Sequence, residues 1–105
     1  MKKSEKRDSL HSTLQAWCFW TSHPDGTPRI EVLWCITGLL QYNEEIGLIT
    51  KKELERITGV IDQFQFGGMA AYKFRGIFLE AIREVFKKDI LKTMETSNKK
   101  GETNN

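Results

Sequence analysis

Residues 45–53, Glu45-Ile46-Gly47-Leu48-Ile49-Thr50-Lys51-Lys52-Glu53, predict the end of one helix and the beginning of the next. Gly47 follows an apolar run with helical spacing, and glycine closes a last helical turn at positive φ because it has no Cβ. Thr50 and Glu53 have the spacing of a capping box, in which each side chain accepts a backbone N–H at a helix start. Only Leu48 and Ile49 separate the two signals, so the two helices must fold back on each other.

Helical patterns extend outward from this corner over most of the chain. We predict an all-α fold, a compact four-helix domain with helices at about residues 9–22, 28–46, 51–66 and 69–93. Thr27 and Pro28 suit the cap and first position of the second helix, since the missing N–H of proline is not needed there. Gly67 and Gly68 end the third helix, whose apolar residues recur at helical spacing.

Residues 15–37 also allow an alternative fold. Their aromatic and β-branched side chains are typical of strands, and the Pro24-Asp25-Gly26 turn could join two strands. Pro28 argues against this reading, because a paired strand would need its N–H. An α+β fold, with a β-hairpin at 15–37 followed by helices, therefore stays open as the second choice.

Length and composition predict a single domain between two polar tails. The chain has 105 residues and a formal net charge of +2. We expect residues 1–8, a basic tail, and residues 95–105, a polar tail, to be disordered, because they contain almost no apolar surface to bury. Residues 9–94 then form the single helical domain.

The chain carries no pattern of an export signal or a membrane span. Its longest apolar run falls well short of the roughly 20 residues that a membrane helix needs, so we expect a cytoplasmic protein without a membrane partner. Cys18 and Cys35 are then expected to be reduced and buried, although a disulfide between them stays open.

Few residues suit catalysis or metal binding. His11 and His23 are the only histidines, and with Cys18 and Cys35 they lack the short paired spacings of structural zinc sites. No glycine-rich phosphate loop is present. We therefore predict no enzymatic activity, no catalytic residue, no metal, no cofactor and no small-molecule substrate.

An excess of aromatic residues gives the main functional prediction. Trp17, Phe19 and Trp20 lie within four consecutive positions, which point about 100° apart on a helix. A peripheral helix buries only part of its circumference, so at least one of the three should face outward, where large aromatics act as interface anchors. With Trp34 they form the predicted binding surface of a small regulatory or adaptor protein, whose partner is another protein or its own copy as a homodimer.

The alternative function is a nucleic-acid-binding transcriptional regulator. Its candidate phosphate contacts lie in the last helix and the tails: Lys73, Arg75, Lys87, Lys88 and Lys92. The sequence pI of about 8.6 is below the value of about 9 typical of dedicated nucleic-acid binders. A helix-turn-helix is also disfavoured, since the Gly67-Gly68 pair would interrupt the helix that enters the DNA groove.

Overall fold

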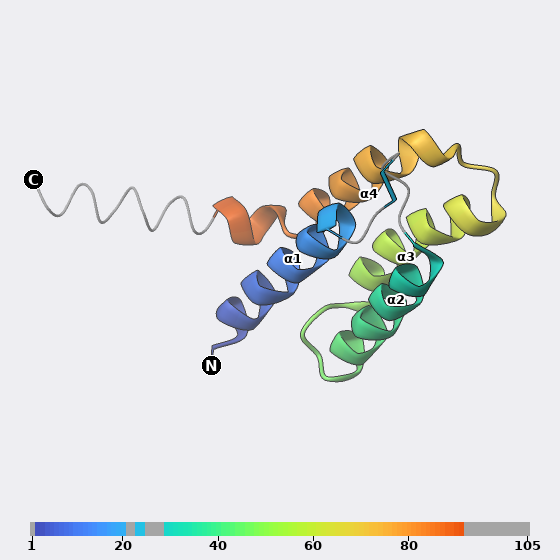
Figure 1. Ribbon diagram of the computed structural model, residues 1–105. Helices are drawn as coiled ribbons and strands as arrows, with labels where there is room; N and C mark the ends of the chain where they lie inside the picture. Colours follow the sequence, from blue (N-terminus) through green and yellow to red (C-terminus); the bar gives the residue numbers. More distant parts are fainter. Residues whose placement is uncertain (1, 21–22, 25–28, 92–105) are drawn as a thin grey trace, which may run out of the picture.

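The computed structural model describes residues 2–20, 23–24 and 29–91, with the backbone alone at residues 19 and 20. These ranges contain α1 (Lys3–Trp20), α2 (Ile30–Glu45), α3 (Lys51–Phe66) and α4 (Ala71–Val85), and a short helical segment at residues 87–91 follows (Figure 1). The all-α prediction is confirmed. The β-hairpin alternative is not supported, because residues 15–20 lie in α1 and residues 30–37 lie in α2.

The corner between α2 and α3 has the predicted geometry. Gly47 adopts a φ of 79°. The Thr50 hydroxyl accepts the backbone N–H of Glu53 at 3.1 Å, and the Glu53 carboxylate accepts the backbone N–H of Thr50 at 2.9 Å. Leu48 and Ile49 are buried under the corner, so they hold the two helices together from inside.

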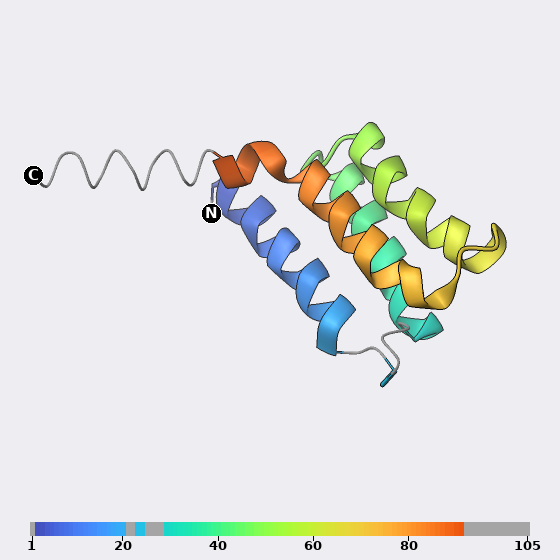
Figure 2. The same cartoon turned by 90° about the horizontal axis from the view of Figure 1, so that it is seen from above.

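The four helices surround one core in the order α1, α4, α3, α2. Figure 2 shows α1 and α3 on opposite sides of α4, with α2 behind α4. The close helix pairs are α3 with α4, α1 with α4 and α2 with α3. Among the described helices, α1 and α2 are neighbours that do not form a close pair, so one side of the bundle is left open.

Aromatic side chains fill the space between α3 and α4. The rings of Phe64 and Phe74 lie 4.8 Å apart and those of Phe74 and Phe78 lie 5.3 Å apart, measured between centroids. Both Phe74 and Phe78 have no exposed surface. The other fully enclosed large side chains are Phe86, Leu14, Leu33, Ile36, Leu40, Ile57, Ile61, Ile82 and Cys18.

The first helix begins earlier than predicted. Residues 3–8 are helical and continue α1, so the expectation of a disordered tail over residues 1–8 is wrong from Lys3 onward. The reason is tertiary: the Arg7 guanidinium is held by Glu53 and Asp89, which stabilises a turn that has little apolar surface of its own.

Other boundaries also differ from the prediction. Arg29 has an extended backbone, with φ −70° and ψ 142°, so Pro28 is not the first residue of α2 and the predicted start at residue 28 is wrong. Ala70 is likewise extended, and the last long helix stops before Phe86 rather than at residue 93. The bounds predicted for the third helix, 51–66, are confirmed. The tail at residues 95–105, the predicted cap at Thr27 and the predicted helix end at 22 lie outside the described residues.

Candidate functional site

The open side of the bundle forms a groove between α1 and α2. It consists of two hollows, of about 340 Å³ and about 240 Å³. Thr13 and Cys35 are each followed four residues later by another lining residue, Trp17 and Leu39, in the neighbouring hollow. Since residues four apart lie on one helix face, the two hollows follow each other along the same side, which we call the α1/α2 groove.

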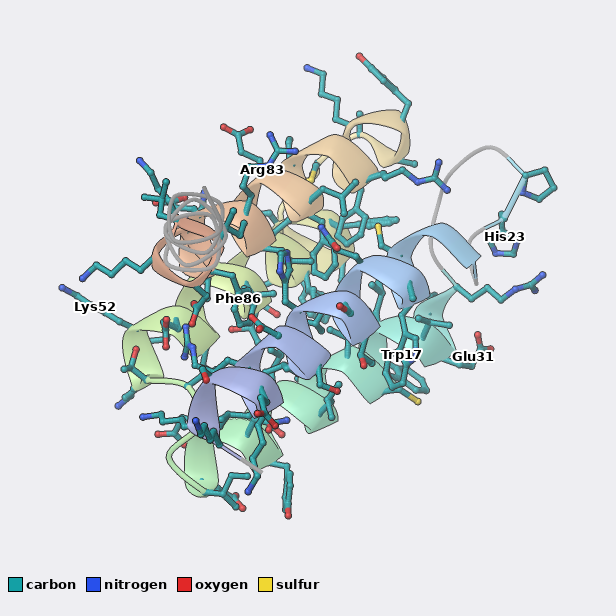
Figure 3. All side chains as sticks on the ribbon, turned by 90° about the vertical axis from the view of Figure 1, so that its left-hand side faces the viewer. Trp17, His23, Glu31, Lys52, Arg83 and Phe86 are labelled. Atoms are coloured by element: carbon teal, nitrogen blue, oxygen red, sulfur yellow. The ribbon has the colours of Figure 1, made fainter. Side chains whose placement is uncertain are left out.

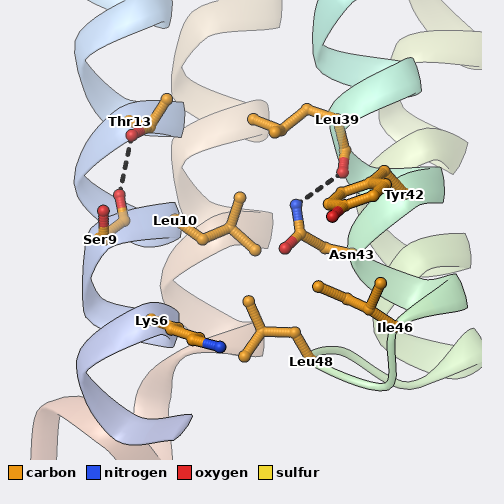
Figure 4. Close-up of a pocket in the computed structure, with 9 residues that line it drawn as sticks. All are labelled: Lys6, Ser9, Leu10, Thr13, Leu39, Tyr42, Asn43, Ile46 and Leu48. Carbon is orange, nitrogen blue, oxygen red and sulfur yellow. Dashed lines mark hydrogen bonds between the residues drawn. The ribbon is translucent and has the colours of Figure 1, made fainter. Parts of the chain in front are cut away.

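The larger hollow lies at the end where α1 begins and α2 ends (Figure 4). Its lining is mainly apolar, with one buried amide. Asn43, only 7% exposed, donates its Nδ2 hydrogen to the carbonyl of Leu39 at 2.7 Å. This leaves Oδ1 as an acceptor without a partner among the described residues. The lining residues are Lys6, Ser9, Leu10, Thr13, Leu39, Tyr42, Asn43, Ile46 and Leu48.

The smaller hollow lies at the other end of the groove. Trp17 contributes from α1, and Glu31, Val32 and Cys35 contribute from α2. Figure 3 shows Trp17 and Glu31 on the same side of the molecule, one from each helix. The lining is therefore an indole, two small apolar or thiol groups and one carboxylate, a surface suited to burying apolar side chains.

An ion-pair cluster fixes the position of α1 from the opposite side. The Arg7 guanidinium lies 2.9 Å from Glu53 and 3.0 Å from Asp89, and it donates to the carbonyl of Leu48 at 2.8 Å. It also lies over the Phe86 ring, 5.1 Å from its centroid. The hydrogen bond to Glu53 is the largest of the effects that raise the pKa of Arg7. This cluster ties α1 to the rest of the bundle without drawing it toward α2.

The same cluster changes the acidity of Glu53. Burial alone would raise its pKa, but hydrogen bonds from Arg7 and from Thr50 bring the pKa below its usual 4.5. Glu53 thus serves both as the helix cap and as an ionised partner of Arg7. Its charge is balanced within the fold, so it is not a candidate for proton transfer.

The buried side of α1 carries the two other groups with shifted pKa values. His11 stacks on Phe86 with ring centroids 4.9 Å apart, and burial lowers its pKa below 6.5 against the opposing charges of Asp8 and Asp89. Burial also raises the pKa of the Cys18 thiol, against the effect of Arg75. Neither residue lines the groove, and a thiol with a raised pKa is a poor nucleophile.

The structure brings only part of the predicted aromatic surface into the groove. Trp17 lines the smaller hollow and is half-buried against the core. Trp34 is 65% exposed but does not line the groove, because it lies about 100° around α2 from Cys35. The side chains of Phe19 and Trp20 lie outside the described part of the chain.

The predicted cations do not come together. Arg75 is partly buried, with its Nε enclosed, and acts on Cys18 of α1. The ammonium of Lys73 lies over the Tyr72 ring, 5.8 Å from its centroid. Lys87 and Lys88 are exposed about 12 residues further along, roughly 18 Å away on a helix. Lys92 lies outside the described residues.

The sequence analysis missed most of the groove. Leu39, Asn43 and Lys6 were not singled out, nor were Tyr42 and Ile46, which are 59% and 53% exposed. A signal was available: α2 is apolar around most of its circumference, more than a peripheral helix can bury. The sequence could not show which of its faces would be left open.

Other predictions concern cysteines, metals and membranes. Cys18 is buried as expected, but Cys35 is exposed and both thiols are free, so the expectation that both are buried is wrong for Cys35. Within the described ranges, no group of three or more metal-ligating His, Cys, Asp or Glu side chains occurs. None of the described helices combines the length and apolar character needed to cross a bilayer.

Comparison of the chain with family models, with curated proteins and with solved structures finds no match. The argument for function therefore rests on the residues of the α1/α2 groove.

Proposed function

We propose that this protein binds another protein by accepting an amphipathic helix into the α1/α2 groove. One observation carries the proposal: three of the four neighbouring helix pairs around the core pack closely, and the fourth, α1 with α2, leaves an apolar groove. A helix lying along such a groove would complete the packing that the bundle itself leaves open. Recognition of this kind uses apolar side chains at helical spacing.

The composition of the groove favours a protein partner. Tyr42 and Ile46 form an exposed rim at one end, and Trp17 lies at the other. Tyrosine and tryptophan provide much of the binding energy at protein interfaces, because they bury a large area with few rotatable bonds. Asn43 adds a single polar acceptor, which can fix the register of a bound helix.

The same features argue against nucleic acid as the partner. Affinity for a phosphate backbone requires several cations that reach neighbouring phosphates. Lys6 is the single cation among the described residues that line the groove. The role of a non-enzymatic regulator or adaptor that acts through protein binding remains our proposal, and its own copy is the second candidate partner.

Two tyrosines of the chain provide a matched test. Tyr42 is on the groove rim, whereas Tyr72 is 79% exposed on α4. The tagged full-length protein is used as bait in a nuclease-treated lysate of its native host, alongside Tyr42→Glu and Tyr72→Glu variants. We expect Tyr42→Glu to reduce capture of the bound protein at least about tenfold, as for an interface anchor, and Tyr72→Glu to retain it.

Circular dichroism and urea unfolding confirm that both variants stay folded, since exposed substitutions change stability by about 0.5 kcal/mol or less. Equal loss or equal retention in the two variants would place the binding surface elsewhere. Sedimentation of the purified protein separates capture of another protein from self-association.

A further inference from the structure

The two ends of the α1/α2 groove carry opposite charges. Lys6 lines the end formed by the start of α1, and Glu31 lines the end formed by the start of α2. Among the described lining residues these are the only charged side chains, and neither forms an ion pair with a described residue. Between them the lining is apolar or uncharged.

Neighbouring charges do not cancel this polarity within the groove. Glu44 and Glu45 lie near the Lys6 end in sequence, but they do not line it, because they point about 100° or more away from Ile46 and Tyr42 on α2. Arg7, one residue after Lys6, is committed to Glu53 and Asp89 on the other side of α1. The groove therefore has one basic end and one acidic end.

The chain's own remaining segments do not suit the groove. Residues 92–105 contain one hydrophobic residue, Met94, and residues 21–28 contain none. An amphipathic helix needs an apolar residue on nearly every turn of one face. The occupant must come from another molecule.

From this arrangement, and resting on the function proposed above, we infer the chemistry of the partner helix. It carries an acidic side chain beside Lys6, a basic side chain beside Glu31 and apolar side chains between them. Lys6 and Trp17 mark the two ends on α1, 11 residues or roughly 16 Å apart. The acidic and basic residues of the partner should thus be about 11 residues apart, a spacing that returns to the same helix face.

These charges decide orientation more than affinity. Exposed ion pairs contribute little stabilisation, while like charges at the same positions oppose the reversed arrangement. A bound helix is consequently expected in one direction, with its basic end next to Glu31 and close to Cys35. Cys35 is exposed whereas Cys18 is buried, so the native thiol can report which end lies there.

The test uses the full-length protein and two synthetic helices of about 18 residues. Both have the same leucine stripe, one glutamate and one lysine about 11 residues apart; one carries a chloroacetyl group beside the lysine, the other beside the glutamate. Thioether formation at Cys35, with loss of chloride, is followed by intact-protein mass spectrometry. We expect the lysine-side group to react at least about fivefold faster, and the double variant Lys6→Glu with Glu31→Lys to reverse this preference.

The controls distinguish the two proposals. Cys35→Ser must abolish labelling. If both peptides label equally, faster than free chloroacetamide and dependent on Tyr42, the groove binds helices but the charge assignment is overturned. If neither peptide labels faster than free chloroacetamide, the helix-binding function itself is overturned. A preference for the glutamate-side group contradicts the inference directly.

Discussion

The pair formed by α3 and α4 and the pair formed by α1 and α2 contrast within one small bundle. Each of α3 and α4 confines its large apolar residues mainly to one stripe, and the stripes meet around Phe74 and Phe78. In α2, apolar residues extend past the stripe, and Tyr42 and Ile46 are left exposed beside α1. The difference shows that a helix with apolar residues beyond its core stripe leaves surface for a partner to cover.

The largest expected effect tests the packed pair. Phe78→Ala removes a fully enclosed ring between α3 and α4, which should lower the free energy of unfolding by about 3–5 kcal/mol. Leu39→Ala is the matched change in the groove, where the side chain is only partly buried, and we expect about 1–2 kcal/mol. Urea unfolding measures both. Equal losses would mean that the groove is packed as tightly as the α3–α4 seam.

The next effect concerns the cluster that holds α1 to the packed pair. Arg7→Ala leaves Glu53 and Asp89 without their cation, and because the cluster is partly exposed we expect a loss of about 2 kcal/mol at neutral pH. Arg7→Lys is the control that keeps the charge but not the forked geometry.

The pH dependence of that loss has a defined sign. The pKa of Glu53 is lowered in the folded protein, so its ionised form contributes stability above its unfolded pKa near 4.5, and this contribution disappears as pH falls through the folded pKa. Unfolding curves from pH 7 to about pH 3 should therefore converge for the wild type and Arg7→Ala. A gap that stays constant over this range would contradict the role assigned to Glu53.

A smaller effect tests the corner that connects α2 to the packed pair. Gly47→Ala places a Cβ at φ 79° and should lower stability by about 1 kcal/mol. Gly38→Ala is the control within α2, where an added Cβ meets nothing within 4 Å, and it should raise stability by up to about 1 kcal/mol. Thermal unfolding of the two variants should therefore shift in opposite directions.

The smallest effect concerns the buried side of α1. The pKa of His11 is lowered by burial, so the unfolded state takes up a proton more readily and stability declines as pH falls below 6.5. His11→Phe keeps the stacking on Phe86 and removes Nε2, which is buried without a hydrogen-bond partner. We expect a gain of up to about 1 kcal/mol at pH 7 and a flatter stability profile from pH 7 to about 5. An unchanged profile would show that His11 does not titrate in this range.

The amino-acid sequence determined the elements of this protein where the signals are local. The glycine and the capping box at 47–53 set the α2–α3 corner, and apolar spacing set α3 from Lys51 to Phe66, because caps and helix periodicity act within a few residues. The helical start at Lys3 depended instead on Arg7 meeting Glu53 and Asp89, residues far away in the chain. The sequence also showed that α1 and α2 are too apolar for peripheral helices. Only the tertiary structure decided which of their faces stays open, since that depends on how three other helix pairs fill the core.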